Sequence, residues 1–133
     1  MTLAASTINV GGTSSVTGGS STGLLYRGGD INQGKYILDD GSEFLAITKV
    51  NFSVLEPKVN SGAPNGYTQG RNFLSYIEPL ALDNGNLTHN SFRGEFAFDV
   101  ETTDAEKDAM IENVVQLIYG SALREFYQSQ TLS

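Results

Sequence analysis

A strict alternation of apolar and mostly polar positions runs through residues 43–57, EFLAITKVNFSVLEP. Successive side chains of a β-strand point to opposite faces, so this pattern predicts a strand with one apolar and one mixed face. The mixed face carries Lys49, Asn51 and Ser53. Pro57 lacks the N–H that a sheet ladder needs and is expected to end the strand.

The same alternation recurs in residues 91–100, SFRGEFAFDV, and predicts a second long strand. Its apolar side would be formed by Phe92, Phe96, Phe98 and Val100. Its other side would carry Ser91, Arg93 and Glu95, together with Ala97 and Asp99. Both strands therefore separate an apolar face from a polar one, as expected when one side of an antiparallel sheet is covered and the other is open.

The other strand signals are weaker. A third strand is expected from Arg71 to Pro79, but its phase is open, because Phe73 lies on one face and Tyr76 on the other. Glycine pairs separate short β-prone pieces in residues 6–26 and predict small hairpins there. Two further stretches, 28–43 and 81–90, are rich in glycine or polar residues and are expected to be loops.

The chain changes to a helical pattern in residues 102–130. Thr103 suits the N-cap of a helix, and Glu106 three residues later completes a capping box. Gly120 is placed to end this helix and Ser121 to cap a second, shorter one. The apolar positions of the two helices include Met110, Val114, Leu117, Ile118, Leu123 and Phe126.

The order of these elements predicts an α+β fold in one domain, residues 1–133. Residues 1–101 would form an N-terminal β-hairpin and an antiparallel meander sheet, and residues 102–130 two C-terminal helices. A chain of this length is sufficient for one domain with a normal core.

Taken alone, the net charge of −7 argues against nucleic-acid binding, because phosphate contacts need Lys and Arg. However, six of the fifteen acidic residues fall between Asp99 and Glu112. Nine acidic residues then remain against eight basic residues in the whole chain. The acidity is thus concentrated at the start of the expected helix, and the rest of the chain is nearly balanced.

The sequence contains no motif of an enzyme. There is no nucleophile elbow, no zinc-protease motif and no phosphate-binding loop. The chain has no cysteine and a single histidine, His89, which is expected in a solvated loop, so neither a metal site nor a cofactor is expected. The N-terminal residues lack the pattern of a signal peptide, and no apolar run is long enough for a membrane span, which predicts a soluble cytosolic product.

Basic residues occur on each of the three expected strands, as Lys49, Arg71 and Arg93. On neighbouring strands they could form one positive stripe, with Asn51 and Ser53 available to hydrogen-bond bases or phosphates. The alternative interpretation is that these side chains are ordinary solvent-facing charges.

The C-terminal third, FAFDVETTDAEKDAMIENVVQLIYGSALREF, resembles the coat proteins of single-stranded RNA bacteriophages (leviviruses), particularly their Q-beta-like branch. An F-x-F strand leads through Thr103-Asp104 into a long helix, with Glu106 and Lys107 following and a break at Gly120-Ser121. The resemblance is specific over residues 91–128 and extends to the whole chain as an order of elements.

This resemblance implies a homodimer with one continuous ten-stranded sheet, in which the helices of each subunit lie across the strands of its partner. The helical segment would then be a dimer clasp through Met110, Val114, Leu117, Ile118, Leu123 and Phe126. The dimers would assemble into an icosahedral T=3 shell around genomic RNA in the host cytoplasm. A maturation protein would be a further partner, and no membrane would be involved.

The resemblance also implies that the polar sheet face contacts RNA, and in relatives this face binds an RNA hairpin that represses translation. Carried over by position, the RNA-binding residues are Lys49, Asn51, Ser53, Arg71, Ser91, Arg93 and Glu95. Phe73 or Tyr76 would stack on a base, depending on the strand phase. Because Glu95 and the net acidity oppose phosphate binding, modest non-specific RNA affinity is expected.

Two other function classes compete with a coat protein. One is a non-viral β-sheet module that binds single-stranded nucleic acid. The other is a secreted structural or adhesion subunit, suggested by the Gly-, Ser- and Thr-rich N-terminal part but not by its start, which lacks a signal pattern.

Overall fold

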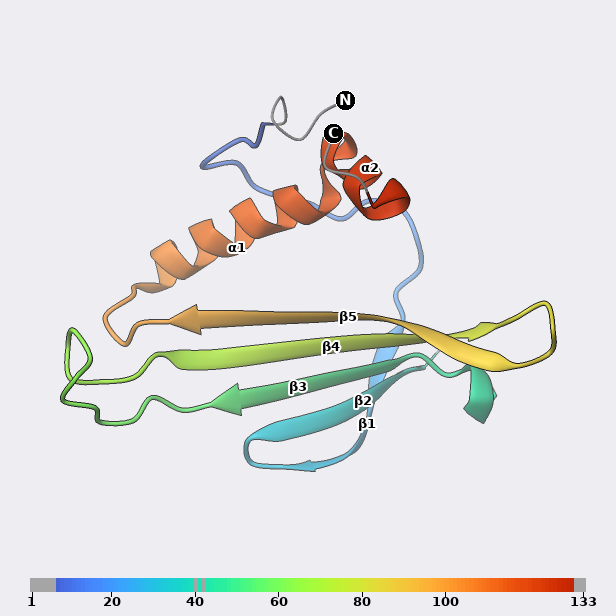
Figure 1. Cartoon of the computed structure of the whole chain (residues 1–133), viewed down its shortest axis with the longest axis horizontal. Helices are drawn as coiled ribbons and strands as arrows, with labels where there is room; N and C mark the ends of the chain where they lie inside the picture. The colour runs from blue at the N-terminus through green and yellow to red at the C-terminus, as the bar shows by residue number, and fades with distance from the viewer. Residues whose placement is uncertain (1–6, 40, 42, 131–133) are drawn as a thin grey trace. The chain divides into compact units, whose positions relative to one another are not determined.

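The structure is a computed structural model that describes residues 7–39, 41 and 43–130. The chain divides into two compact units (Figure 1). One unit is Gly19–Val100, and the other unites the described parts of Met1–Gly18 and Glu101–Ser133.

The Gly19–Val100 unit is a five-stranded antiparallel meander, in which each strand pairs with the next along the chain (Figure 1). The strands are β1 (Gly23–Asp30), β2 (Gln33–Asp39), β3 (Lys49–Leu55), β4 (Gly70–Ala81) and β5 (Leu87–Phe98). The meander and the two helices that follow confirm the predicted fold class. The two strands with clear alternation, β3 and β5, are confirmed with the predicted faces.

The first hairpin lies later in the chain than predicted. Among residues 7–22 the structure has no strand, so the small hairpins expected in that region are wrong. The hairpin is formed instead by β1 and β2, across a stretch that was expected to be mostly loop. Its turn is held by the carboxylate of Asp30, whose Oδ1 accepts hydrogen bonds from the backbone N–H of Asn32 (2.7 Å) and Gln33 (3.1 Å).

Glycine in β2 accommodates an aromatic ring and does not break the strand. A Cβ at Gly34 would lie 2.8 Å from Cε2 of Tyr36, so the ring occupies the space where a side chain would be. A Cβ at Gly94 in β5 would lie 3.0 Å from the ring of Phe92. Both glycines therefore support the aromatic packing of the sheet, which explains why they occur inside strands.

Three strand boundaries differ from the prediction. β3 begins only at Lys49, because Phe44–Ala46 form a short 3-10 helix. β4 continues through Pro79, which is tolerated because the ladder with β3 ends at Ile77 and leaves that part of β4 with one strand neighbour. β5 begins at Leu87 and includes His89, so this histidine lies in a strand and not in a loop.

The connection between β4 and β5 is a tight turn of residues 82–86 and not the longer loop that was predicted. The backbone N–H of Leu82 donates to the carbonyl oxygen of Asn86 (2.8 Å), and Gly85 adopts a φ of 84°. The side chain of Asn84 accepts a hydrogen bond from the backbone N–H of Asn86 (3.0 Å). A left-handed glycine after an asparagine is typical of such hairpin turns.

One face of the sheet is apolar and aromatic. The face that we call the apolar face is formed by Leu24, Tyr26, Tyr36, Leu38, Val50, Phe52, Val54, Leu74, Tyr76, Phe92, Phe96 and Phe98. The rings of Tyr26, Tyr36 and Phe52 follow one another with centroid separations of 5.5 Å. Among the described residues, the buried apolar side chains are only Val50 on this face and Ile37 on the opposite face, so most of this face remains at least partly accessible in one chain.

The other unit contains helices α1 (Asp104–Tyr119) and α2 (Ser121–Ser129). The predicted capping box is confirmed: Oγ1 of Thr103 accepts from the backbone N–H of Glu106, and the Glu106 carboxylate accepts from the backbone N–H of Thr103. Gly120 ends α1 as predicted, but it is also the N-cap of α2, so the capping role expected for Ser121 is wrong.

The N-terminal segment is attached to α1 by side chains of the helix. The amide of Gln116 pairs with the backbone of Asn9, accepting from its N–H (2.6 Å) and donating to its carbonyl oxygen (2.8 Å). The carboxylate of Glu112 accepts from the backbone N–H of Ser14 (2.7 Å). These contacts fix an otherwise irregular segment along one side of the helix.

We expect Asp30→Ala to lower the melting temperature at neutral pH, because the β1–β2 turn loses its acceptor. Hydrogen bonds, chiefly from the backbone N–H of Asn32 and then from the side chain of Gln33, hold the pKa of Asp30 below its usual 3.8. A carboxyl whose pKa is depressed by folding adds stability above its unfolded pKa, and this stability is lost as the pH falls through the folded pKa. The gap in melting temperature between wild type and variant should therefore narrow as the pH falls below about 4.

Thermal unfolding followed by circular dichroism measures this gap. Asp30→Asn is the matched control, because its side-chain carbonyl still accepts the turn hydrogen bonds but does not titrate. A gap between wild type and Asp30→Ala that stays constant from neutral to acidic pH would contradict the assigned role of the carboxylate.

Candidate nucleic-acid interface

The cross-strand register brings the polar residues of four strands onto one side of the sheet. In an antiparallel ladder, directly paired residues share a face, and residues two apart along a strand share it as well. By this rule the face opposite to the aromatic one carries Gln33, Lys35, Lys49, Asn51, Ser53, Arg71, Phe73, Ser75, Ser91, Arg93 and Glu95. We call these residues the polar face.

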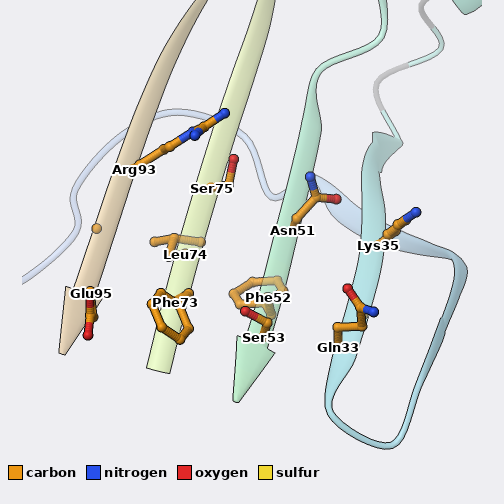
Figure 2. Close-up of a pocket in the computed structure, with 12 residues that line it drawn as sticks. Gln33, Lys35, Asn51, Phe52, Ser53, Phe73, Leu74, Ser75, Arg93 and Glu95 are labelled. Atoms are coloured by element: carbon orange, nitrogen blue, oxygen red, sulfur yellow. The ribbon is translucent and has the colours of Figure 1, made fainter. Parts of the chain in front are cut away.

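The centre of the polar face is a row that crosses four strands, from Lys35 through Asn51 and Ser75 to Arg93. A cation therefore lies at each end, and an amide and a hydroxyl lie between them. With strands about 4.8 Å apart, the row is roughly 14 Å long at the backbone. In Figure 2 the side chain of Arg93 extends from β5 over β4 toward Ser75.

The next row toward the β1–β2 turn consists of Gln33, Ser53, Phe73 and Glu95. Phe73 is 37% exposed, which is high for an aromatic ring in the interior of a strand. Arg71, one further row along, donates from Nη1 to Oε1 of Glu95 at 2.7 Å. Glu95 is the direct cross-strand neighbour of Phe73, so an exposed aromatic ring stands next to a carboxylate whose charge is neutralised by Arg71.

An open hollow of about 380 Å³ lies between these two rows (Figure 2). Its walls are the polar side chains of both rows, and Gly34, Phe52, Leu74 and Gly94 form the floor between them. Because the side chains of Phe52 and Leu74 belong to the apolar face, the floor is formed by backbone. The hollow is thus lined by amide, hydroxyl, aromatic and charged groups.

A second hollow, of about 470 Å³, is surrounded by three cations, Arg27, Lys35 and Lys49. Arg27 reaches this position from β1, where the register with β2 shifts between Tyr26 and Gly28. The side chains of Lys35, Lys49 and Arg93 form no hydrogen bond or ion pair with another residue that the structure describes. These cations are therefore available to an anionic ligand.

All eight predicted RNA-binding residues lie on the polar face. The register also settles the open phase of β4: Phe73 joins the polar face, and Tyr76 belongs to the apolar face, so Tyr76 is not available for stacking there. Ser91 lies in the same row as Lys49, separated from it by Ile77.

The sequence analysis did not predict three residues of the polar face, nor Arg27 at the hollow beside Lys35 and Lys49. Gln33 and Lys35 were missed because β2 was expected to be a loop, although the alternation Gln33, Lys35, Ile37 could have indicated a strand. Ser75 was missed because the phase of β4 was open. Arg27 had no recognisable signal, because a register shift and not a regular alternation sets its position.

The apolar positions predicted for a dimer clasp are accessible in one chain. Met110, Leu117 and Ile118 are each about 44–45% exposed, Phe126 is 37% exposed, and Val114 and Leu123 are partly buried. Apolar helix positions with this much exposure are typical of a surface that contacts another chain.

The described residues contain no group of three or more His, Asp or Glu side chains that could hold a metal ion. Neither α1 nor α2 has the length and apolar character of a membrane-spanning helix.

The fold is shared with proteins of known virus-like particles. The protein of the virus-like particle of bacteriophage GQ-907 matches with a TM-score of 0.86 and 23% identity, covering 99% of this chain and all of the other. The protein of the virus-like particle of Beihai levi-like virus 32 matches with a TM-score of 0.72 and 12% identity, covering 86% of this chain and 91% of the other. That of Beihai levi-like virus 21 matches with a TM-score of 0.66 and 15% identity, covering 87% of this chain and 91% of the other. No family model and no curated protein sequence matches the chain.

These matches confirm that the chain has the fold predicted from the resemblance to phage coat proteins. Sequence identities below 25% show the fold alone, and the placement in the Q-beta-like branch stays a prediction.

Proposed function

We propose that this protein is the coat subunit of a single-stranded RNA bacteriophage, which assembles as dimers into an icosahedral shell around genomic RNA. The observation that carries this proposal is the match over 99% of the chain to a protein that forms a virus-like particle. A fold does not by itself define a function, so the exposed surfaces of the chain supply the rest of the argument. The protein would act structurally and reside in the virion.

A free strand edge supports dimerisation. β5 has twelve residues and stands at one end of the strand order, paired only with β4 among the described strands. A long unpaired edge is a template for pairing with another chain, and a two-fold axis at this edge would pair β5 with β5 of a second copy. The result would be a ten-stranded sheet whose polar faces form one continuous surface.

The exposed apolar surfaces of the two units also favour association with a second copy of the chain. Phe52 and Phe92 on the apolar face are 40% and 43% exposed, and Leu117 and Ile118 on α1 are 45% and 44% exposed. A dimer in which the helices of one subunit lie on the sheet of the other would bury both sets together. At about 25 cal/mol for each Å² of apolar surface removed from water, such burial favours association strongly.

The polar face would contact the enclosed RNA. We propose that the same face also binds an RNA hairpin and thereby represses translation. Unpaired cations at Lys35, Lys49 and Arg93 suit phosphates, and Phe73 offers a ring on which a base can stack. A non-viral module that binds single-stranded nucleic acid would use the same face. It would not form large uniform particles.

Sedimentation velocity of the protein expressed in bacteria, recorded at 260 and 280 nm, separates these functions. We expect a fast, narrow boundary rich in 260 nm absorbance, which corresponds to a shell loaded with host RNA. A slow dimer that binds RNA would favour the non-viral module. A monomer with a protein spectrum would overturn both the coat function and the clasp.

Replacing Leu117 or Ile118 with Asp should prevent dimerisation, because a carboxylate would be placed in a buried apolar seam at a cost of several kcal/mol. Sedimentation equilibrium of each variant measures the oligomeric state, and circular dichroism reports whether the helices remain. Gln128→Asp adds the same charge at an exposed position of α2 and should leave the dimer intact. A folded dimer of Leu117→Asp or Ile118→Asp would refute the clasp.

The double variant Lys49→Ala with Arg93→Ala should still form shells but bind single-stranded RNA more weakly. Loss of two phosphate contacts should reduce the slope of log affinity against log salt by about 1.4. The matched control is Lys58→Ala with Lys107→Ala, which removes two charges outside the polar face. An unchanged salt dependence in the first variant would remove Lys49 and Arg93 from the interface.

A further inference from the structure

Glu95 is the one acidic residue among the eight predicted RNA-binding residues, and it stands beside an exposed aromatic ring. It is the direct cross-strand neighbour of Phe73, which is 37% exposed. A carboxylate repels phosphate, so Glu95 weakens a surface that only binds the RNA backbone. Its position beside a stacking ring points to a different role.

The hydrogen bonding of Glu95 leaves one carboxylate oxygen available. Oε1 of Glu95 accepts a hydrogen bond from Nη1 of Arg71 at 2.7 Å. The side chain of Glu95 is 37% exposed and that of Arg71 is 45% exposed. Oε2 accepts no hydrogen bond from another residue that the structure describes. Because Arg71 precedes Phe73 by two residues on β4, the guanidinium holds the carboxylate on the flank of the ring.

A base stacked on Phe73 would bring its polar edge to the neighbouring strands, whose side chains lie about 5 Å away. Ser53 stands on one side of the ring and Glu95 on the other. A carboxylate accepts a hydrogen bond from the exocyclic amino group of cytosine. Uracil presents a carbonyl oxygen at the equivalent position, which an ionised carboxylate repels.

The adjacent row supplies the contacts that such a nucleotide needs for its phosphate. Arg93 lies two residues from Glu95 on β5, which is about 6.8 Å along the strand. One nucleotide can span this separation, with its base on Phe73 and its phosphate near Arg93. The open hollow of about 380 Å³ lies between the two rows.

We propose that Glu95 is a specificity-determining residue that selects amino-bearing bases over uracil at a stacking position on Phe73, with Arg71 as its positioning residue. The inference rests on the proposed RNA-binding function of the polar face. The carboxylate of Glu95 would select the base, whereas the cations of the neighbouring row would bind phosphates without regard to sequence.

Fluorescence anisotropy with 5′-labelled cytidine and uridine octaribonucleotides tests the proposal on the full-length protein. The two pyrimidine probes differ at the base edge that Glu95 would contact, and they carry the same phosphates. At one fixed salt concentration and neutral pH we expect the cytidine octamer to bind about tenfold more tightly. Phe73→Leu should weaken the binding of both octamers, because the stacking ring is lost.

Glu95→Gln separates base recognition from simple charge repulsion. Because an amide can donate a hydrogen bond to the uracil carbonyl, the affinities for the cytidine and uridine octamers should then differ by no more than about twofold. If Glu95 acted only by repelling phosphate, removing its charge would raise both affinities by the same factor and leave their ratio unchanged. Glu78→Gln on β4 is the matched control, because it removes one negative charge at a position whose register assigns it to the opposite side of the sheet. It should leave the ratio unchanged.

Equal affinities of the wild-type protein for the two octamers, or an unchanged ratio in Glu95→Gln, would overturn the role of Glu95 while leaving the RNA interface in place. Absence of binding to either octamer would overturn the interface and the selectivity together. A changed ratio in Glu95→Gln with an unchanged ratio in Glu78→Gln would establish the proposal.

Discussion

The structure depends on one constraint, the register of the antiparallel ladder from β2 to β5. Because side chains alternate with a period of two, the register decides for every residue whether it joins the polar or the apolar face. A slip of one residue in β5 would bring Phe92 beside Ser75 and would move Arg93 onto the apolar face. Within β2 and β5, glycines at positions 34 and 94 leave room for the rings of Tyr36 and Phe92 on the apolar face.

The same register explains how a protein with a net charge of −7 can present a basic surface. Acidic residues gather at the start of α1, where Asp104 and Glu106 suit the positive end of the helix dipole. Lys35, Lys49 and Arg93 lie on the polar face, Arg27 joins Lys35 and Lys49 around one hollow, and Glu95 is paired with Arg71. The polar face carries four cations and one carboxylate, so its formal charge is opposite in sign to that of the whole chain, and a sum over the sequence is a poor guide to its partners.

Features that are encoded locally could be predicted from the sequence. The alternation in β3 and β5 and the capping box at Thr103 each depend on residues a few positions apart, and the structure confirms them. The phase of β4 could not be predicted, because neither of its faces is uniformly apolar and only pairing with β3 and β5 assigns Phe73 to one side. β2 was missed because the run Tyr36-Ile37-Leu38 obscures the alternation and Gly34 resembles a turn residue until the ring of Tyr36 is placed against it.

The distribution of apolar surface links folding to association. A domain of about 130 residues ordinarily buries around two-thirds of the surface of its unfolded chain. Here the buried apolar core among the described residues is only Ile37 and Val50, while aromatic and aliphatic side chains on both units remain 37% exposed or more. Hydrogen bonds in the ladder and caps fix the shape of each unit, but they contribute little net free energy against the entropy of ordering the chain. In the proposed dimer a second copy would supply the remaining apolar burial, so folding and dimerisation would form one equilibrium whose position depends on protein concentration.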